Sequence, residues 1–221
     1  MISHAYCAGR AAEMLGRHSG QLSLVICQLG LGRSATAVRN GTAVATTMGF
    51  TPLDGLMMGS HPGSIEPGIL LYLQRSCGIA AEKLDDLIHH GSGLLGVSGI
   101  SSDYRRVQAA AQSGNERARP ALELSTDKVR SAIGALDVTL GRIDALVFTA
   151  GVGENSASLR SRVCRGLECL GLKLDDNLNA SSRPDADIAD GDASARILVL
   201  QCRQEIMIAR EAVTFRDNKL S

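Results

Sequence analysis

The fold is decided by the stretch Phe148-Thr149-Ala150-Gly151-Val152-Gly153-Glu154-Asn155-Ser156. The run that leads into it, Asp-Ala-Leu-Val-Phe at residues 144–148, is apolar and typical of a strand inside a sheet. Gly151 and Gly153 then allow a sharp turn in which the backbone can approach a ligand without a Cβ in the way. Asn155 or Ser156 can cap the helix that follows, so that free N–H groups and the positive dipole end face the turn. This arrangement suits a phosphate or a nucleotide, although a tight strand-to-helix turn without a ligand explains the same residues equally well.

A second glycine turn follows another apolar run. Residues 22–29 read Leu-Ser-Leu-Val-Ile-Cys-Gln-Leu, a pattern that predicts a buried strand, and Gly30-Leu31-Gly32 ends it. In open α/β sheets, ligands gather beyond the carboxyl ends of the strands, and both glycine turns fall at such ends. Their agreement favours a ligand site over two unrelated turns.

The rest of the chain alternates strands with helices, which predicts an α/β domain. Asn40-Gly41 lies between apolar runs at residues 35–38 and 43–47 and indicates a hairpin. Two glycine-rich segments, residues 48–68 and 91–102, are predicted as loops, and residues 181–194 as a polar surface excursion. The pattern shows no internal repeat and no clear linker. Helices are expected at residues 8–15, 66–75, 81–90, from Asp103 onward, 120–141, 157–170 and 205–213, and a further strand at 196–202.

Composition bounds the function. The 221 residues are 44% hydrophobic and 21% charged, as in ordinary soluble domains, and suffice for one large domain or two small ones. Lysine plus arginine equals aspartate plus glutamate, at 23 each, so no basic field indicates a nucleic acid or an anionic membrane as a partner. Three Tyr, three Phe and no Trp argue against a base-stacking platform. No apolar run approaches membrane-spanning length.

The six cysteines are scattered and form no Cys-x-x-Cys pair. Cys164 and Cys169 have no matching partner pair at zinc-site spacing, so no zinc site is predicted. Cys27 and Cys202 lie in apolar runs and are expected to be small core residues. This usage fits a reducing compartment, and Met1 leads directly into a polar helical pattern rather than a signal peptide, so a cytoplasmic protein is expected.

Several stretches together resemble the acetate/propionate kinase family. Their order, spacing and content agree, and the similarity covers nearly the whole chain. The matching runs are Cys27–Gly32, Met48–Gly59, Ser92–Asp103, Phe148–Ser156 and Glu205–Arg210.

The resemblance implies a particular part of a larger enzyme. Members of the family are about twice this long, and Ser3-His4 resembles the end of a His-Gly-Thr-Ser-His segment near their midpoint. Residues 1–221 are therefore predicted to be the C-terminal, nucleotide-binding half, with the N-terminal half absent. The implied fold is the α/β second domain of the actin-like, sugar-kinase (ribonuclease H-like) two-domain architecture. The absent half would carry a phosphate-binding loop, most of the acyl pocket, a substrate-binding arginine and a catalytic aspartate.

The family transfers the γ-phosphoryl group of ATP to acetate, giving acetyl phosphate and ADP with the help of Mg²⁺, a reaction that depends on positioning and charge neutralisation. By resemblance, Gly30 and Gly32 form a phosphate turn, and Pro52 is a wall of the acyl pocket. Without the resemblance, the glycines are explained by turn geometry and Asp103 by a helix N-cap. The other positions implied to contact nucleotide are Asp103, Tyr104 and Arg105 around the adenosine, and Gly151, Val152, Gly153, Glu154 and Asn155 in the second turn.

The departures from the family lie on the phosphate side. Gln28 and Leu31 replace a histidine and an asparagine, His61-Pro62 replaces an arginine-serine pair, and Gln204 replaces a magnesium-binding glutamate beside the retained Glu205. A glutamine is a poorer ligand for a hard dication than a carboxylate, and a histidine lacks the permanent charge of arginine. A transition-state arginine contributes about 10³–10⁵ in rate to phosphoryl transfer. We therefore assign no catalytic and no metal-binding residue to this chain and expect weak magnesium dependence.

Three interpretations remain open at this point. The chain is a kinase half that acts with a separately encoded N-terminal half, a non-catalytic nucleotide-binding or dimer-forming module, or a degenerate gene fragment. The absent half argues against activity of the chain alone. The family also implies a homodimer, to which residues 63–73 and the helix around Ile206 could contribute, although a role in the core is expected for both.

Overall fold

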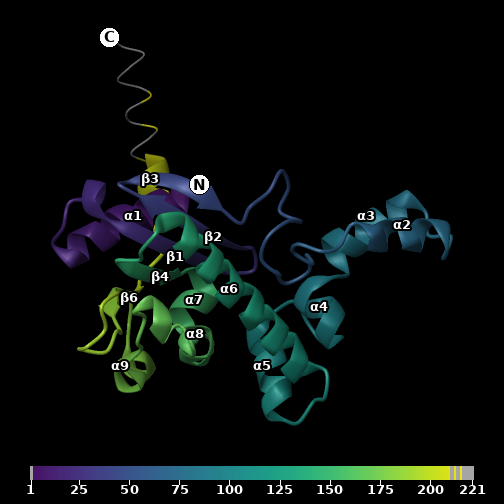
Figure 1. Cartoon of the computed structure of the whole chain (residues 1–221). Helices are drawn as coiled ribbons and strands as arrows, with labels where there is room; N and C mark the ends of the chain where they lie inside the picture. Colours follow the sequence, from purple (N-terminus) through teal and green to yellow (C-terminus); the bar gives the residue numbers. More distant parts are fainter. Residues whose placement is uncertain (1, 210–211, 213–214, 216–221) are drawn as a thin grey trace. The chain divides into compact units, whose positions relative to one another are not determined.

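The computed structural model describes residues 2–209, 212 and 215, and its chain divides into two compact units (Figure 1). Unit 1 is formed by the residues up to 29, residues 36–45 and the residues from 136 onward, and unit 2 by residues 30–35 and 46–135. The chain passes between the units several times, which explains why the sequence shows no single linker.

Unit 1 is built on a sheet with the strand order β3-β2-β1-β4-β6-β5. The central strands β1, β4 and β6 are parallel, and β5 pairs with β6 in the antiparallel direction (Figure 1). The strand bounds are β1 Ser23–Leu29, β2 Arg33–Arg39, β3 Thr42–Thr46, β4 Ala145–Thr149, β5 Ala186–Asp187 and β6 Arg196–Val199.

Helices cover both faces of the central strands. Helix α1 (Ile2–Leu15) packs small side chains such as Ala8 and Ala11 against Leu24 and Ile26 of β1 and against Val147 of β4. The alternate residues of these strands are equally buried and face the opposite side of the sheet. On that side α7 (Ala150–Asn155) contacts β1 and β4, and α8 (Ala157–Cys164) follows α7 along the chain. A parallel sheet covered on both faces requires apolar side chains along the entire strand, which is the pattern of residues 22–29.

The hairpin between β2 and β3 confirms the Asn-Gly prediction. Asn40 and Gly41 have φ values of 53° and 78°, which are the left-handed values that a two-residue type I′ turn requires. Strand β2 is buried almost throughout, whereas β3 is mostly exposed at the edge of the sheet.

Three predictions for unit 1 are wrong in detail. The helix expected at residues 157–170 ends at Cys164, because Gly166 takes a left-handed φ of 80°, and a short 3-10 helix follows at Glu168–Leu170. Residues 181–194 are not merely a surface excursion, since they contain β5 and the buried Ile188 and Ala189. Cys27 is buried in the core as predicted, but Cys202 is only half-buried. The helix predicted at residues 205–213 is present at residues 204–209. Residues 210, 211 and 213 of that prediction lie outside the described residues.

Unit 2 is helical. Its helices are α2 (Gly68–Arg75), α3 (Ala81–His90), α4 (Gly93–Ser98) and α5 (Tyr104–Gln112), and α6 (Ala118–Leu140) begins here and ends in unit 1. Residues 48–67 contain no helix or strand, as expected. Their buried Leu56, Met57 and Met58 join Leu94 and Val107 in the apolar interior.

Helix α4 was predicted as part of a loop. The glycine-rich sequence around it disfavours a helix, but tertiary contacts override this preference. The N–H groups of Leu94 and Leu95 donate to the carbonyls of Met58 and Gly59 at 3.0 and 2.9 Å, and Leu94 is fully buried. Gly99 then ends the helix in a left-handed conformation with φ 69°.

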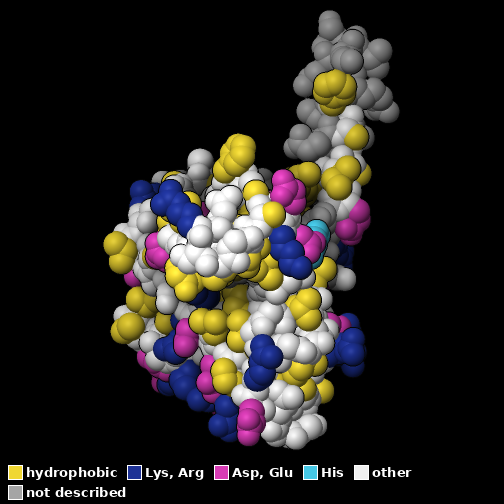
Figure 2. Space-filling model, turned by 90° about the vertical axis from the view of Figure 1, so that its right-hand side faces the viewer, with side chains coloured by type: hydrophobic (Ala, Val, Ile, Leu, Met, Phe, Trp, Pro, Cys, Tyr) yellow, Lys and Arg dark blue, Asp and Glu magenta, His cyan; other side chains and the backbone are white. Residues whose placement is uncertain are grey.

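Helix α2 does not have the core role expected for residues 63–73, since none of its eight residues is buried. Its apolar side chains Ile69, Leu71 and Tyr72 are instead exposed. On the face shown in Figure 2, acidic and basic side chains are interspersed without a field of one sign, in keeping with their equal numbers. In the part of the chain that the structure describes, no helix is both long and apolar enough to cross a membrane.

Candidate functional site

The two glycine segments leave from the same end of neighbouring strands. Strands β1 and β4 are adjacent and parallel, and Gln28 of β1 is paired with Thr149 of β4. Gly30 follows Gln28 by two residues, and Ala150 directly follows Thr149. Asp144 aligns the other end of the strands, because its Oδ2 accepts the N–H of Ser23 at 2.7 Å. The carboxyl ends of β1 and β4 are therefore neighbours, and the binding of a ligand at this edge stays a prediction.

The segment after β4 is a helix start rather than an open turn. Ala150 takes the left-handed conformation with φ 66°, and α7 begins at once. The Ala150 N–H donates to Glu154 Oε1 at 2.8 Å, and the same oxygen accepts the N–H of Cys202 at 2.9 Å. One carboxylate thus ties the start of α7 to the segment that follows β6.

The predicted ligand-facing glycines of this segment differ in their surroundings. A Cβ added to the exposed Gly151 would meet nothing within 4 Å, whereas one on the buried Gly153 would meet Leu29 and Phe148 at 3.6–3.7 Å, an ordinary packing distance. Asn155, also exposed, donates from Nδ2 to the carbonyl of Gly151 at 2.8 Å. Ser156 caps α8 by accepting the N–H of Leu159, as expected. Because packing does not require glycine at position 151, its bare backbone is available for the approach of a ligand.

Sequence reasoning missed the residue that holds this segment in place. Arg160 of α8 is only 2% exposed, and its Nη1 donates to the carbonyls of Gly153 and Glu154 at 2.9 and 2.8 Å. Its Nε and Nη2 donate to Asn179 Oδ1 and to the Asn179 carbonyl at 2.8 and 3.0 Å. Burial lowers the pKa of Arg160. The only hint of this role in the sequence was that Arg160 directly follows the buried Leu159 in a predicted helix.

The glycine turn after β1 belongs to unit 2. The Gly30 N–H donates to the carbonyl of Gly32 at 3.1 Å, and the Leu31 carbonyl accepts the N–H of Gly59 at 3.2 Å. The Leu31 side chain is 70% exposed. A Cβ on Gly32 would have Met58 Sδ, at 3.9 Å, as its nearest contact, so this turn also leaves space above its backbone.

Gly59 brings this turn next to the start of α5 within unit 2. A Cβ on Gly59 would lie 2.8 Å from Leu31 Cδ1 and 2.8 Å from the carbonyl oxygen of Ser102, so only glycine fits between them. Asp103 caps α5 by accepting the Arg105 N–H at 2.9 Å, and the Arg105 side chain folds back onto it at 2.8 Å. These hydrogen bonds hold the pKa of the Asp103 carboxyl below its usual value. Gly30, Gly32, Asp103 and Arg105, predicted from separate stretches, are therefore gathered in one region of unit 2.

Tyr104 lies differently from its neighbours. Its side chain is only 2% exposed, and the guanidinium of the buried Arg33 sits 5.4 Å from its ring centroid. Burial lowers the pKa of Arg33 to about 10, and Arg33 also hydrogen-bonds to Ser125. The side chain of Tyr104 thus packs in the interior of unit 2.

The positions that depart from the family form distinct local contacts. Gln28 Oε1 accepts the hydroxyl of Ser3 at 2.7 Å in unit 1, beside the buried His4, whose pKa burial lowers to about 4. In unit 2, burial lowers the pKa of His61, and the neighbouring His89 and His90 lower it further. The ring centroids of His61 and His89 are 5.7 Å apart. These effects favour the neutral form of His61. Pro52 is exposed in the loop before Leu56.

The comparison with known proteins assigns the chain to a family. The family model described as the Acetokinase family matches residues 2–210. The chain belongs to the acetokinase family. It is 51% identical over 210 residues to the acetate kinase of Cyanothece sp. and 50% identical to that of Gloeobacter violaceus, covering 95% of this chain and 52% of each relative. The chain thus spans about half the length of the curated relatives it matches.

Solved structures agree with this assignment. The acetate kinase of Porphyromonas gingivalis matches with a TM-score of 0.93 and 36% identity, over 96% of this chain and 54% of that one. A propionate kinase from Francisella tularensis matches with a TM-score of 0.89 and 34% identity, over 95% of this chain and 53% of that one. The predicted α/β, actin-like fold is therefore confirmed.

The residues at hand do not fit a dedicated magnesium site. Among the described residues, no group of three or more His, Cys, Asp and Glu side chains is placed to hold a metal ion. Gln204, which stands where the resemblance implies a magnesium-binding glutamate, is neutral, and the adjacent Glu205 is exposed.

Proposed function

We propose that this chain is the C-terminal, nucleotide-binding half of an acetate kinase-like phosphotransferase, which binds ADP or ATP and does not turn over alone. The observation that carries the proposal is the parallel pairing of Gln28 with Thr149, which puts the carboxyl ends of β1 and β4, where the two glycine segments begin, at the same edge of the sheet. Gly32 and Gly151 support it, because neither glycine is required by packing or by a left-handed φ. By family, Asp103 to Arg105 and Gly151 to Asn155 contact the adenosine and phosphates, and Pro52 contacts the acyl group.

The replaced residues support inactivity of the chain alone. His61, whose lowered pKa favours the neutral form, lacks the permanent charge of the arginine implied there by the family, and the amides of Gln28 and Gln204 provide neither imidazole nor carboxylate chemistry. The chain's own residues would bind and orient the nucleotide, while groups for the acyl substrate would come from the N-terminal half of such an enzyme. The Mg²⁺ of the family would then contribute charge neutralisation through the nucleotide rather than through this chain.

Calorimetric titration with ADP, with and without Mg²⁺, tests nucleotide binding. We expect saturable binding that changes little when Mg²⁺ is removed. No heat at millimolar ADP would contradict the proposal and favour a degenerate fragment. Addition of a purified N-terminal half of a relative then separates the two remaining interpretations. Formation of acetyl phosphate would identify the chain as a kinase half. Nucleotide binding without acetyl phosphate formation would indicate a non-catalytic module.

We also propose that the chain forms a homodimer through α2. The exposed fractions of Ile69, Leu71 and Tyr72 are 47%, 51% and 62%, and no residue of this apolar helix is buried in its own unit. Glu66 precedes the helix and Arg75 ends it, so two antiparallel copies would bring opposite charges together at both ends. Light scattering after size exclusion should give twice the 23.2 kDa mass of one chain. The variant Leu71→Lys should give the mass of a single chain. A monomeric parent chain would contradict this proposal.

A further inference from the structure

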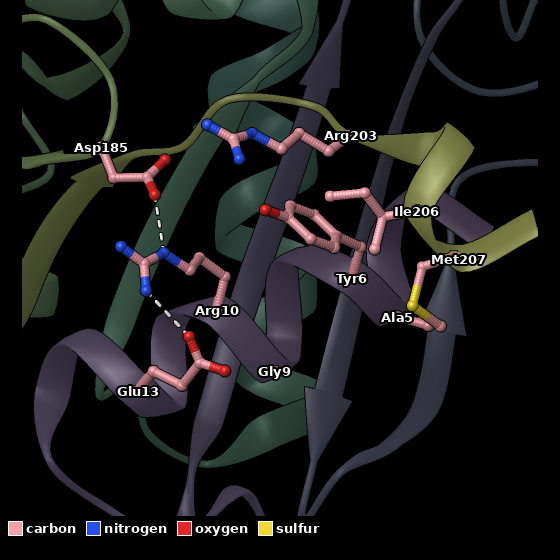
Figure 3. Close-up of a pocket in the computed structure, with 9 residues that line it drawn as sticks. All are labelled: Ala5, Tyr6, Gly9, Arg10, Glu13, Asp185, Arg203, Ile206 and Met207. Carbon is pink, nitrogen blue, oxygen red and sulfur yellow. Dashed lines mark hydrogen bonds and ion pairs between the residues drawn. The ribbon is translucent and has the colours of Figure 1, made fainter. Parts of the chain in front are cut away.

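A pocket of about 470 Å³ lies in unit 1 between α1 and residues 203–207 (Figure 3). None of the predicted nucleotide-contacting residues lines it. We propose that this pocket binds a zwitterionic α-amino acid with an apolar side chain. The proposal rests on the distribution of charge and apolar surface around the pocket and is independent of nucleotide binding.

One end of the pocket carries a net negative charge. Arg10 Nε donates to Asp185 Oδ2 at 2.6 Å, and Arg10 Nη1 donates to Glu13 Oε2 at 2.8 Å. Two carboxylates therefore share a single guanidinium, which leaves this cluster with an excess of one negative charge. Asp185 Oδ1 also accepts the N–H of Gln201 at 2.9 Å, so the carboxylate is fixed in place and retains acceptor positions. A ligand ammonium group would find its counter-charge here.

Arg203 supplies the opposite charge nearby. Its Nε and Nη2 donate to the neutral Oε1 of Gln201 at 3.3 and 3.1 Å, and among the described residues it takes part in no ion pair. Figure 3 shows its side chain on the same side of the pocket as Asp185, above the ring of Tyr6. The Gln201 contact orients the guanidinium without neutralising it, so its charge and fork geometry suit a ligand carboxylate.

The other end of the pocket is apolar. Ile206 and Met207 come from the helix at residues 204–209, and the ring of Tyr6 lies between them and the charged groups (Figure 3). An ammonium and a carboxylate on the same carbon, with an apolar side chain, match this order of negative cluster, cation and apolar wall. The volume is at the lower end of the range for small-molecule sites and exceeds what such an amino acid needs.

Leucine and two derivatives test the assignment on the full chain. The chain is labelled with ¹³C at its methionine methyl groups, and the Met207 signal, assigned with Met207→Leu, reports on the pocket, whereas Met57 and Met58 in unit 2 serve as internal references. We expect leucine to shift the Met207 signal in a saturable manner at millimolar concentration. N-acetyl-leucine, which lacks the ammonium, and leucinamide, which lacks the carboxylate, should each bind about tenfold more weakly.

Arg203→Gln separates a real site from an accidental response. This change should weaken leucine binding about tenfold while leaving leucinamide binding unchanged, because only the carboxylate contact is lost. The matched control is Arg165→Gln, which removes an exposed arginine of the same unit outside the pocket and should change neither. A Met207 signal that leucine does not move, equal binding of leucine and its two derivatives, or an Arg203→Gln chain that binds leucine normally would each overturn the proposal.

Discussion

Two segments of this chain share the pattern of an apolar strand followed by Gly-x-Gly, but they adopt different structures. After β4, the residues from Ala150 form a helix whose last carbonyls are fixed by the buried Arg160. After β1, Gly30 to Gly32 form an exposed turn with hydrogen bonds inside the turn, to Gly59, and from Arg33 Nε to the Gly30 carbonyl. The local pattern is the same, so the difference comes from partners that are distant in sequence.

The comparison also separates the two roles of glycine in such segments. Gly59 is required because a side chain there would collide with Leu31 and Ser102. A Cβ would meet nothing within 4 Å at Gly151 and only Met58 Sδ, at 3.9 Å, at Gly32, so packing does not explain the lack of a side chain at either position. A ligand that approaches the backbone at these two positions would explain their glycines. We therefore expect substitutions there to affect ligand binding and stability differently.

The largest expected effect is on the segment after β4. Arg160→Ala should lower the free energy of unfolding by about 3 kcal/mol, because it leaves the buried carbonyls of Gly153, Glu154 and Asn179 without their donor. Urea denaturation followed by circular dichroism measures the change. The control Arg165→Ala, at an exposed position, should stay within about 0.5 kcal/mol. A loss below 1 kcal/mol for Arg160→Ala would mean that the segment holds its shape without the arginine.

Strand positions and several helices could be predicted because local patterns and tertiary structure agree there. Asn40-Gly41 forms its turn, and the helix at Ala81–His90 has the predicted bounds. Helix α4 was missed because it forms on hydrogen bonds from a distant loop that compensate for its glycines. Arg160 was missed because its partners, Asn179 and the carbonyls of α7, converge on it only after folding.

The candidate site shows the same division. The family pattern identified Asp103 and Arg105, and the structure brings them near the glycine turn of the same unit. The pattern could not indicate that Tyr104, between them, turns inward onto Arg33, because the alternation of inner and outer faces at a helix start depends on packing. Contact with adenosine stays a prediction for these residues.

The second prediction concerns the residue that aligns the two strands from which the segments leave. Burial by itself would raise the pKa of Asp144, but the Ser23 N–H and the Arg17 guanidinium outweigh it and hold this pKa below its usual value. Asp144→Asn should therefore cost about 1–2 kcal/mol of unfolding free energy at pH 7. Because the folded-state pKa is depressed, the contribution of Asp144 is complete above the unfolded value of about 3.9 and is lost as the pH falls through the folded value.

Urea denaturation of both chains between pH 7 and pH 3 tests this sign. The difference in stability between the parent chain and Asp144→Asn should be constant at neutral pH and shrink below about pH 4. Arg142→Gln is the milder control, since Arg142 is 3.8 Å from Asp144 and largely exposed. A difference that grows on acidification would contradict the pKa direction.

The third prediction separates ligand approach from structural need at position 151. Gly151→Ala should leave the free energy of unfolding unchanged or raise it by up to about 1 kcal/mol, since the position is helical and has free space. If the bare backbone serves the nucleotide, affinity for ADP should fall about tenfold in a calorimetric titration. The matched control is Gly134→Ala in α6, where a Cβ also meets nothing within 4 Å, and which should show the same stability gain with unchanged affinity. Equal affinities of the two variants would leave the glycine at 151 without a binding role.

The smallest effect is expected at the exposed turn after β1. Leu31→Asn restores the amide that the family resemblance places there, on a side chain that is already 70% exposed, so stability should change by no more than about 0.5 kcal/mol. An amide above the Gly30–Gly32 backbone adds hydrogen-bond donors for phosphate, and affinity for ADP should rise about threefold, as measured by the same titration. Leu124→Asn, at another exposed leucine of unit 2, controls for the general effect of an added amide. If Leu31→Asn raises affinity and Leu124→Asn does not, the turn after β1 lies at the phosphates even though its own contacts are few. If neither variant changes affinity, the open turn differs from the fixed one in function as well as in structure, and of the two glycine segments only the one after β4 contacts the phosphates.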